Sequence, residues 1–150
     1  MQKQNLLLAT LIVALCNTLP LTAAQESGCM KAPTTAEQYQ CANNELAAAE
    51  QDLEKALADA LQRYTPKPDD ANGNSLPPPE RSQQAGYETR MRQRLESSQK
   101  AWLQYQTAAC AAVSDFYEGG TMAPTATALC KAEIAKQRAK FLRANFGADR

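Results

Sequence analysis

Apolar side chains recur at helical spacing along most of the chain, in three stretches separated by proline and glycine. The first stretch covers residues 34–64, which contain neither glycine nor proline. Its apolar positions follow at steps of three, four and seven residues: Leu46, Leu53, Leu57, Leu61 and Tyr64, with Ala49 and Ala60 on the same stripe. Thr34 and Glu37 have the spacing of a capping box. The pattern predicts an amphipathic helix of about 30 residues, roughly 45 Å long.

Two further stretches predict two more helices, over residues 80–117 and 121–145. Gly119 and Gly120 separate them, and the first glycine can take the left-handed conformation that ends helices. Thr121 is expected to cap the last helix. The stripe expected to face the core contains Met91, Leu95, Trp102, Ala109, Ala112 and Phe116 in the second helix, with Tyr105 at its edge, and the third helix is expected to bury Leu129, Ile134, Phe141 and Leu142.

Residues 65–81 interrupt the helical pattern. Five of the eight prolines lie between Pro66 and Pro79, together with a glycine and two asparagines. Such a composition predicts an exposed loop, with the triple proline at its end extended as polyproline II. No stretch alternates with the period of a β-strand. The sequence therefore predicts an all-α, three-helix, up-down-up bundle with a long Pro-rich loop after its first helix.

Residues 1–24 have the features of a signal peptide rather than of a folded element. Lys3 gives a positive start, residues 6–15 form an apolar run, and small residues precede Gln25, before which cleavage is expected. The run is shorter than the roughly 20 residues that a transmembrane helix needs. We therefore expect a periplasmic or secreted protein in which residues 25–150 form a single domain.

Cys16 lies in this leader and offers an alternative route to the membrane, through lipidation. The residue before it is Leu15, where lipoprotein signals have a small residue. Cleavage before Gln25 is therefore preferred, and it removes Cys16 from the mature chain.

An even number of cysteines then remains: Cys29, Cys41, Cys110 and Cys130. In an exported chain this favours two disulfides over a zinc site, whose cysteines usually come in close pairs. Cys110 and Cys130 lie ten residues before and after Gly120, so an antiparallel turn brings them to the same height. We expect them to pair with each other, and Cys29 to pair with Cys41. A pairing of Cys41 with Cys110 or Cys130 remains open.

Charge and composition exclude several functions. The formal net charge is +0, and removal of the leader takes away only Lys3, so the mature chain has a net charge of −1. The basic stripe of a nucleic-acid binder is therefore absent. The chain has no histidine, which excludes imidazole catalysis and histidine-ligated metals. The acidic pairs Glu50/Glu54 and Asp52/Asp59 fall on an exposed helix surface rather than across a cleft. We expect no enzyme activity, cofactor or metal.

An ordered set of residues runs through the predicted helices: Cys41, Leu46, Ala49, Leu53, the run 98–102 (Ser-Gln-Lys-Ala-Trp), Tyr105, Cys110, the run 119–121 (Gly-Gly-Thr), Cys130, Arg138 and Leu142. This set resembles the LprI-type lysozyme-inhibitor family of small exported bacterial proteins. The resemblance covers about residues 29–145. Three positions depart from it, since the family often has Asp at Glu50, an aromatic residue near Ala56 and Arg at Gln106; the first change keeps the charge.

The matched residues also have structural interpretations. Trp102 is expected to be a core anchor in the middle of the second helix. Tyr105 is expected at the edge of the core with its hydroxyl in water. Arg138 is expected to form an ion pair with Glu50 across the bundle.

The resemblance implies a protein partner, a lysozyme, and the second turn is the expected contact. Lysozymes are typically basic, so an inhibitor should offer acidic or hydrogen-bonding groups on a rigid frame. The candidates are Asp115, Glu118, Gly119, Gly120 and Thr121, with Glu26 nearby if the residues before the first helix fold back. The alternative is a cell-envelope interaction module with another protein partner, because a net charge of −1 gives little steering toward a basic target. The sequence sets no oligomeric state.

Overall fold

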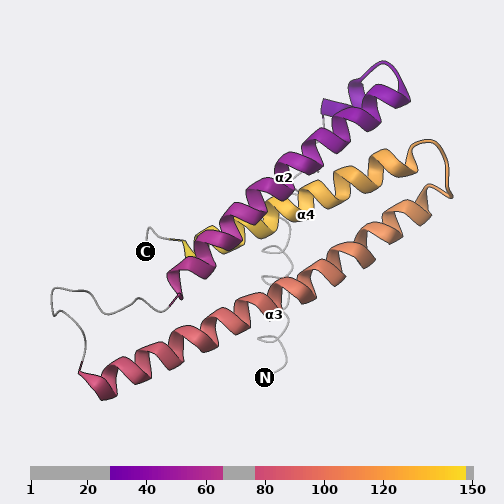
Figure 1. Cartoon of the computed structure of the whole chain (residues 1–150). Helices are drawn as coiled ribbons and strands as arrows, with labels where there is room; N and C mark the ends of the chain where they lie inside the picture. The colour runs from indigo at the N-terminus through magenta and orange to yellow at the C-terminus, as the bar shows by residue number, and fades with distance from the viewer. Residues whose placement is uncertain (1–27, 66–76, 148–150) are drawn as a thin grey trace, which may run out of the picture.

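The computed structural model describes residues 28–65 and 77–147. They form a short 3₁₀ helix, η1 (Gly28–Lys31), and three long helices, α2 (Thr35–Arg63), α3 (Pro78–Phe116) and α4 (Ala123–Phe146). The long helices run up, down and up (Figure 1), and no strand occurs in the described ranges. The predicted all-α fold is therefore confirmed. The predicted signal peptide and most of the predicted Pro-rich loop lie outside the described residues.

The start of α2 follows its sequence closely. The hydroxyl of Thr34 accepts a hydrogen bond from the Glu37 amide at 3.2 Å, and the Thr34 amide donates to the Glu37 carboxylate at 3.1 Å. This is the predicted capping box, in which two backbone donors that the helix leaves unpaired are satisfied.

The starts of the other two helices differ from expectation. α3 begins at Pro78, inside the stretch predicted to be an extended loop, because a proline fits the first turn of a helix, where its missing amide would be unpaired anyway. α4 begins at Ala123 after Met122, which makes no side-chain cap. The predicted Thr121 cap is therefore wrong. Pro124 lies in the first turn of α4, where a proline is tolerated.

The core is a close contact between α2 and α4 that is lined by alanine. Along this alanine seam, Ala135, Ala139 and Leu142 of α4 have no exposed surface. The cluster of buried residues also contains Ala49, Leu53, Ala56, Ala60, Leu95 and Ala132. Methyl side chains let two helix backbones approach closely, so a long thin pair of helices gains dense packing without large side chains.

Most of the larger apolar residues surround this seam instead of filling it. Trp102, Leu57 and Tyr64 are only partly buried, and they pack against the alanine cluster from its edges. Phe116 and Phe141 were predicted to be buried, but 81% and 48% of their surfaces are exposed. Those two predictions were wrong because neither phenylalanine belongs to the buried cluster between α2 and α4.

Ion pairs run along the outside of the seam. Lys136 on α4 lies 3.1 Å from the Glu45 carboxylate on α2. Arg143 donates to Asp52 Oδ2 at 2.9 Å, and this hydrogen bond lowers the pKa of the Asp52 carboxyl below its ordinary value. Both pairs are largely exposed, so they fix the register of the two helices more than they add stability.

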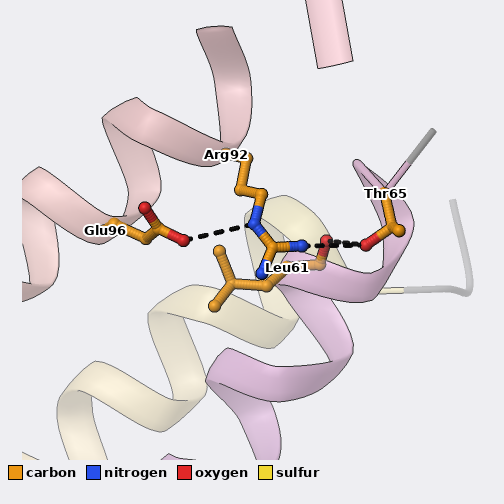
Figure 2. A network of polar contacts seen from close by, with 4 residues as sticks. All are labelled: Leu61, Thr65, Arg92 and Glu96. Carbon is orange, nitrogen blue, oxygen red and sulfur yellow. Dashed lines mark hydrogen bonds and ion pairs between the residues drawn. The ribbon is translucent and has the colours of Figure 1, made fainter. Parts of the chain in front are cut away.

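α3 is attached to the pair along one narrow strip. It packs mainly on α4, and toward the α3–α4 turn α4 lies between α2 and α3 (Figure 1). At the other end, Arg92 of α3 donates to the Thr65 hydroxyl at 3.0 Å and to Glu96 at 3.2 Å (Figure 2). The rings of Tyr64 and Tyr87 meet edge to face there, with centroids 6.2 Å apart. α3 therefore shows solvent a wide surface. Among the described helices, none is sufficiently long and apolar to cross a membrane.

The alanine seam predicts that the free energy of unfolding depends sharply on side-chain size at the seam positions. Ala135→Leu should lower the free energy of unfolding by about 1–3 kcal/mol, because added methylenes force the two backbones apart. Ala144→Leu, at an exposed position of the same helix, should change it by less than about 0.5 kcal/mol. Chemical denaturation of the oxidised protein measures both values. Equal stability of the two variants would show that the seam is not tightly packed.

The narrow attachment of α3 predicts a specific role for the Cys110–Cys130 bridge, which spans 20 residues. Replacing both cysteines by alanine should lower the free energy of unfolding by about 3 kcal/mol on the loop-entropy model. Because Trp102 lies on α3, its fluorescence should report looser packing in this variant and not in Cys29→Ala/Cys41→Ala. An unchanged tryptophan signal would mean that other contacts suffice to hold α3.

Candidate functional site

Both predicted disulfides are present. Cys29 pairs with Cys41, with Cα atoms 5.4 Å apart, and Cys110 pairs with Cys130, with Cα atoms 5.7 Å apart. The first bridge ties η1 to α2, and the second ties α3 to α4 close to their shared turn. The sulfurs of Cys29 and Cys41 lie close to the Glu45 carboxylate, but a disulfide removes the thiolates that a metal would need. The cysteines therefore brace the frame that carries the α3–α4 turn.

The α3–α4 turn has an unusual backbone. Gly119 has φ +71°, as predicted for a glycine that ends a helix, and Glu118 before it has φ +48°. A left-handed glutamate is uncommon, since its Cβ crowds the following carbonyl. Hydrogen bonds hold the turn on both sides, from the Glu118 amide to the Asp115 carbonyl at 2.9 Å and from the Gly120 amide to the Tyr117 carbonyl at 2.7 Å.

The two glycines serve different purposes. Gly119 needs its conformational freedom, and a Cβ there would meet no atom within 4 Å. Gly120 needs space, because a Cβ there would lie 3.0 Å from the Tyr117 carbonyl oxygen. The turn is therefore tight at Gly120 and open at Gly119.

The predicted contact residues all lie together on this exposed turn. Asp115, Glu118, Gly119, Gly120 and Thr121 are solvent-exposed. Within the described part of the chain, neither acidic side chain forms a hydrogen bond or an ion pair, so both carboxylates are available. Glu26 lies outside the described residues.

A hollow of about 460 Å³ adjoins the turn, between α2 and the end of α3. Tyr39 and Leu46 of α2 form one wall, Ser114 and Gly119 form the other, and α4 supplies the floor. Lys131 is its one charged lining residue among those described. Gly119 thus belongs both to the tip of the turn and to the rim of this hollow.

Sequence reasoning missed two aromatic residues beside the turn. Phe116 is 81% exposed, and its ring packs edge to face on Tyr117, with centroids 5.5 Å apart. Phe116 was placed in the core because its spacing matched the helical stripe. The sequence feature that could have indicated its exposure is its position at the very end of α3, far from the alanine seam.

Arg138 joins α3 to α4 without the expected partner. Its Nη2 donates to the Ser98 hydroxyl at 2.8 Å and its Nε to the Gln99 side-chain oxygen at 3.2 Å. Its guanidinium lies 5.4 Å from the centre of the Phe141 ring. The predicted pair with Glu50 is therefore wrong, since Arg138 faces α3 rather than α2. Partial burial lowers the pKa of Arg138 below its ordinary value.

Three neighbouring α3 residues differ in how far they take part in the contact with α4. Trp102 is half-buried at its edge rather than a central anchor, and Tyr105 is 61% exposed, more than expected. Gln106 is buried and donates to the Lys131 carbonyl at 3.0 Å. The glutamine that departs from the family pattern thus forms a direct tie between α3 and α4.

The acidic pairs on α2 do not form a hydrolytic site. Glu50, Glu54, Asp52 and Asp59 are all exposed on one helix, and Asp52 is bound to Arg143. A glycosidase needs two carboxylates on opposite sides of a bound sugar.

Comparison with known proteins gives one result. The family model described as "Lysozyme inhibitor LprI" matches residues 29–142, which include both disulfides and the α3–α4 turn. No curated protein and no solved structure gives a significant match. Because the match covers most of the chain, the protein belongs to the LprI lysozyme-inhibitor family.

Proposed function

We propose that this exported protein binds a lysozyme and blocks its activity through the α3–α4 turn. The observation that carries the proposal is the exposed, left-handed backbone at Glu118 and Gly119, held at the end of a disulfide-braced pair of helices. Strained backbone of this kind clusters at functional sites, where the surrounding structure maintains it. A rigid turn loses little conformational entropy on binding.

The chemistry of the turn fits a cleft with a basic rim. The small residues Gly119, Gly120 and Thr121 let the chain approach a concave surface closely. Asp115 and Glu118 are free to accept charge-assisted hydrogen bonds from arginines at the rim. Because a lysozyme cleft holds its own pair of catalytic carboxylates, the two acidic side chains should meet the rim while the neutral residues enter.

Export supports the same proposal. The predicted leader before Gln25 and the two disulfides suit an oxidising compartment, where lysozymes act. The second candidate, an envelope module with another protein partner, uses the same frame and differs only in what the turn binds.

The proposal predicts that the two turn carboxylates matter for inhibition and not for folding. Asp115→Ala/Glu118→Ala should weaken inhibition at least about tenfold, since each loses a hydrogen bond to a charged group. Its melting temperature should stay unchanged, because neither side chain has a partner to lose within the described residues. Titration of oxidised mature protein into activity assays with several lysozyme types measures the effect.

A matched control removes two negative charges elsewhere. Glu50→Ala/Glu54→Ala changes the net charge equally on the exposed surface of α2 and should inhibit like the wild type. Equal weakening by both double variants would mean that only overall charge matters and would contradict the turn contact. Failure of the wild type to inhibit any lysozyme would favour the envelope module.

A further inference from the structure

The C-terminal half of α3 is exposed yet carries no charge. From Ala101 to Ser114 the sequence contains no charged residue, although the segment includes Leu103, 49% exposed, and Tyr105, 61% exposed. Exposed helices of monomeric proteins normally carry charge on their solvent side. An uncharged helix surface with exposed aromatic rings is typical of a contact with another molecule.

One stripe that runs through this segment and one turn or less beyond each end has the spacing of a coiled coil. The steps between its residues are four, three, four, three and four: Ser98, Trp102, Tyr105, Ala109, Ala112 and Phe116. At 1.5 Å per residue the stripe is about 27 Å long. None of the six is fully buried in the monomer. Trp102 packs in part against the alanine cluster and Ser98 accepts from Arg138, and the exposed part of the stripe is available for a second helix.

We propose that this α3 stripe packs antiparallel against the same stripe of a second copy, to form a two-fold symmetric dimer. The order of side-chain sizes points to this occupant. In an antiparallel pair centred between Tyr105 and Ala109, each large residue faces a small one of the other copy. Tyr105 meets Ala109, Trp102 meets Ala112, and Phe116 meets Ser98.

The charge distribution agrees with a second copy of the chain. Both stripes are neutral over the central segment, so two identical surfaces meet without like charges facing each other. Fewer than three heptads make a short contact, which suits a reversible dimer of about micromolar affinity. The antiparallel arrangement places the two α3–α4 turns at opposite ends, where Asp115 and Glu118 remain exposed. The inference goes beyond the proposed function and does not depend on it.

Neighbouring alanines provide a matched test. Ala112→Glu places a carboxylate in the stripe opposite Trp102 of the second copy, whereas Ala111→Glu places the same group one residue away, off the stripe. Both alanines are exposed in the monomer, so neither change should prevent folding. Sedimentation velocity and light scattering on oxidised mature protein, from about 1 μM to 1 mM, should bracket the dissociation constant.

The expected result is a monomer–dimer equilibrium in the wild type. Ala111→Glu should leave the dimer dissociation constant within about twofold of the wild-type value, and Ala112→Glu should raise it at least about tenfold. The emission of Trp102, the only tryptophan, should shift to shorter wavelength on dimerisation, and Ala112→Glu should abolish that shift. A wild type that stays monomeric at 1 mM would overturn the proposal, as would a trimer or equal weakening by both variants. A monomer whose inhibition of lysozyme is lost in Ala112→Glu would assign the stripe to the lysozyme instead.

Discussion

The close approach of α2 and α4 is the constraint on which the rest of the structure depends. Alanine at Ala56, Ala60, Ala135 and Ala139 removes the side-chain bulk that would hold the two helices apart. The pair is therefore narrow, and among the larger α3 side chains described, only Leu95 is buried in its core cluster. The others pack at its edge or face solvent, which explains why a chain with one small core shows exposed aromatic rings at Phe116 and Tyr105.

α3 is held by a few specific ties rather than by a broad apolar interface. The Cys110–Cys130 bridge, the Gln106 amide on the Lys131 carbonyl and Arg138 on Ser98 act at successive heights along α4. Directional ties of this kind fix where a helix lies without covering it. The consequence for function is a rigid turn at one end and an uncovered helix surface beside it.

Local features were predictable from the sequence, and the rotation of the helices was not. The capping box at Thr34, the left-handed Gly119 and the pairing of cysteines across the second turn follow from short-range spacing. Whether alanine or leucine positions form the seam depends on how closely the two helices approach each other. The apolar periodicity of one helix does not contain that information. For the same reason Arg138 was assigned to Glu50, when a modest rotation of α4 directs it to α3. The five turn residues lie together and are exposed, and their role as a partner contact stays a proposal.

Hydrogen exchange of the oxidised mature protein, with and without an excess of lysozyme, is the most direct test of the functional account. The account predicts new protection of backbone amides at residues 115–121, with the exposed surface of α2 unchanged. This measurement needs no substitution and detects binding even when inhibition is weak. Protection confined to α2, with the turn exchanging as freely as in the unbound protein, would contradict the assignment of the α3–α4 turn as the lysozyme contact.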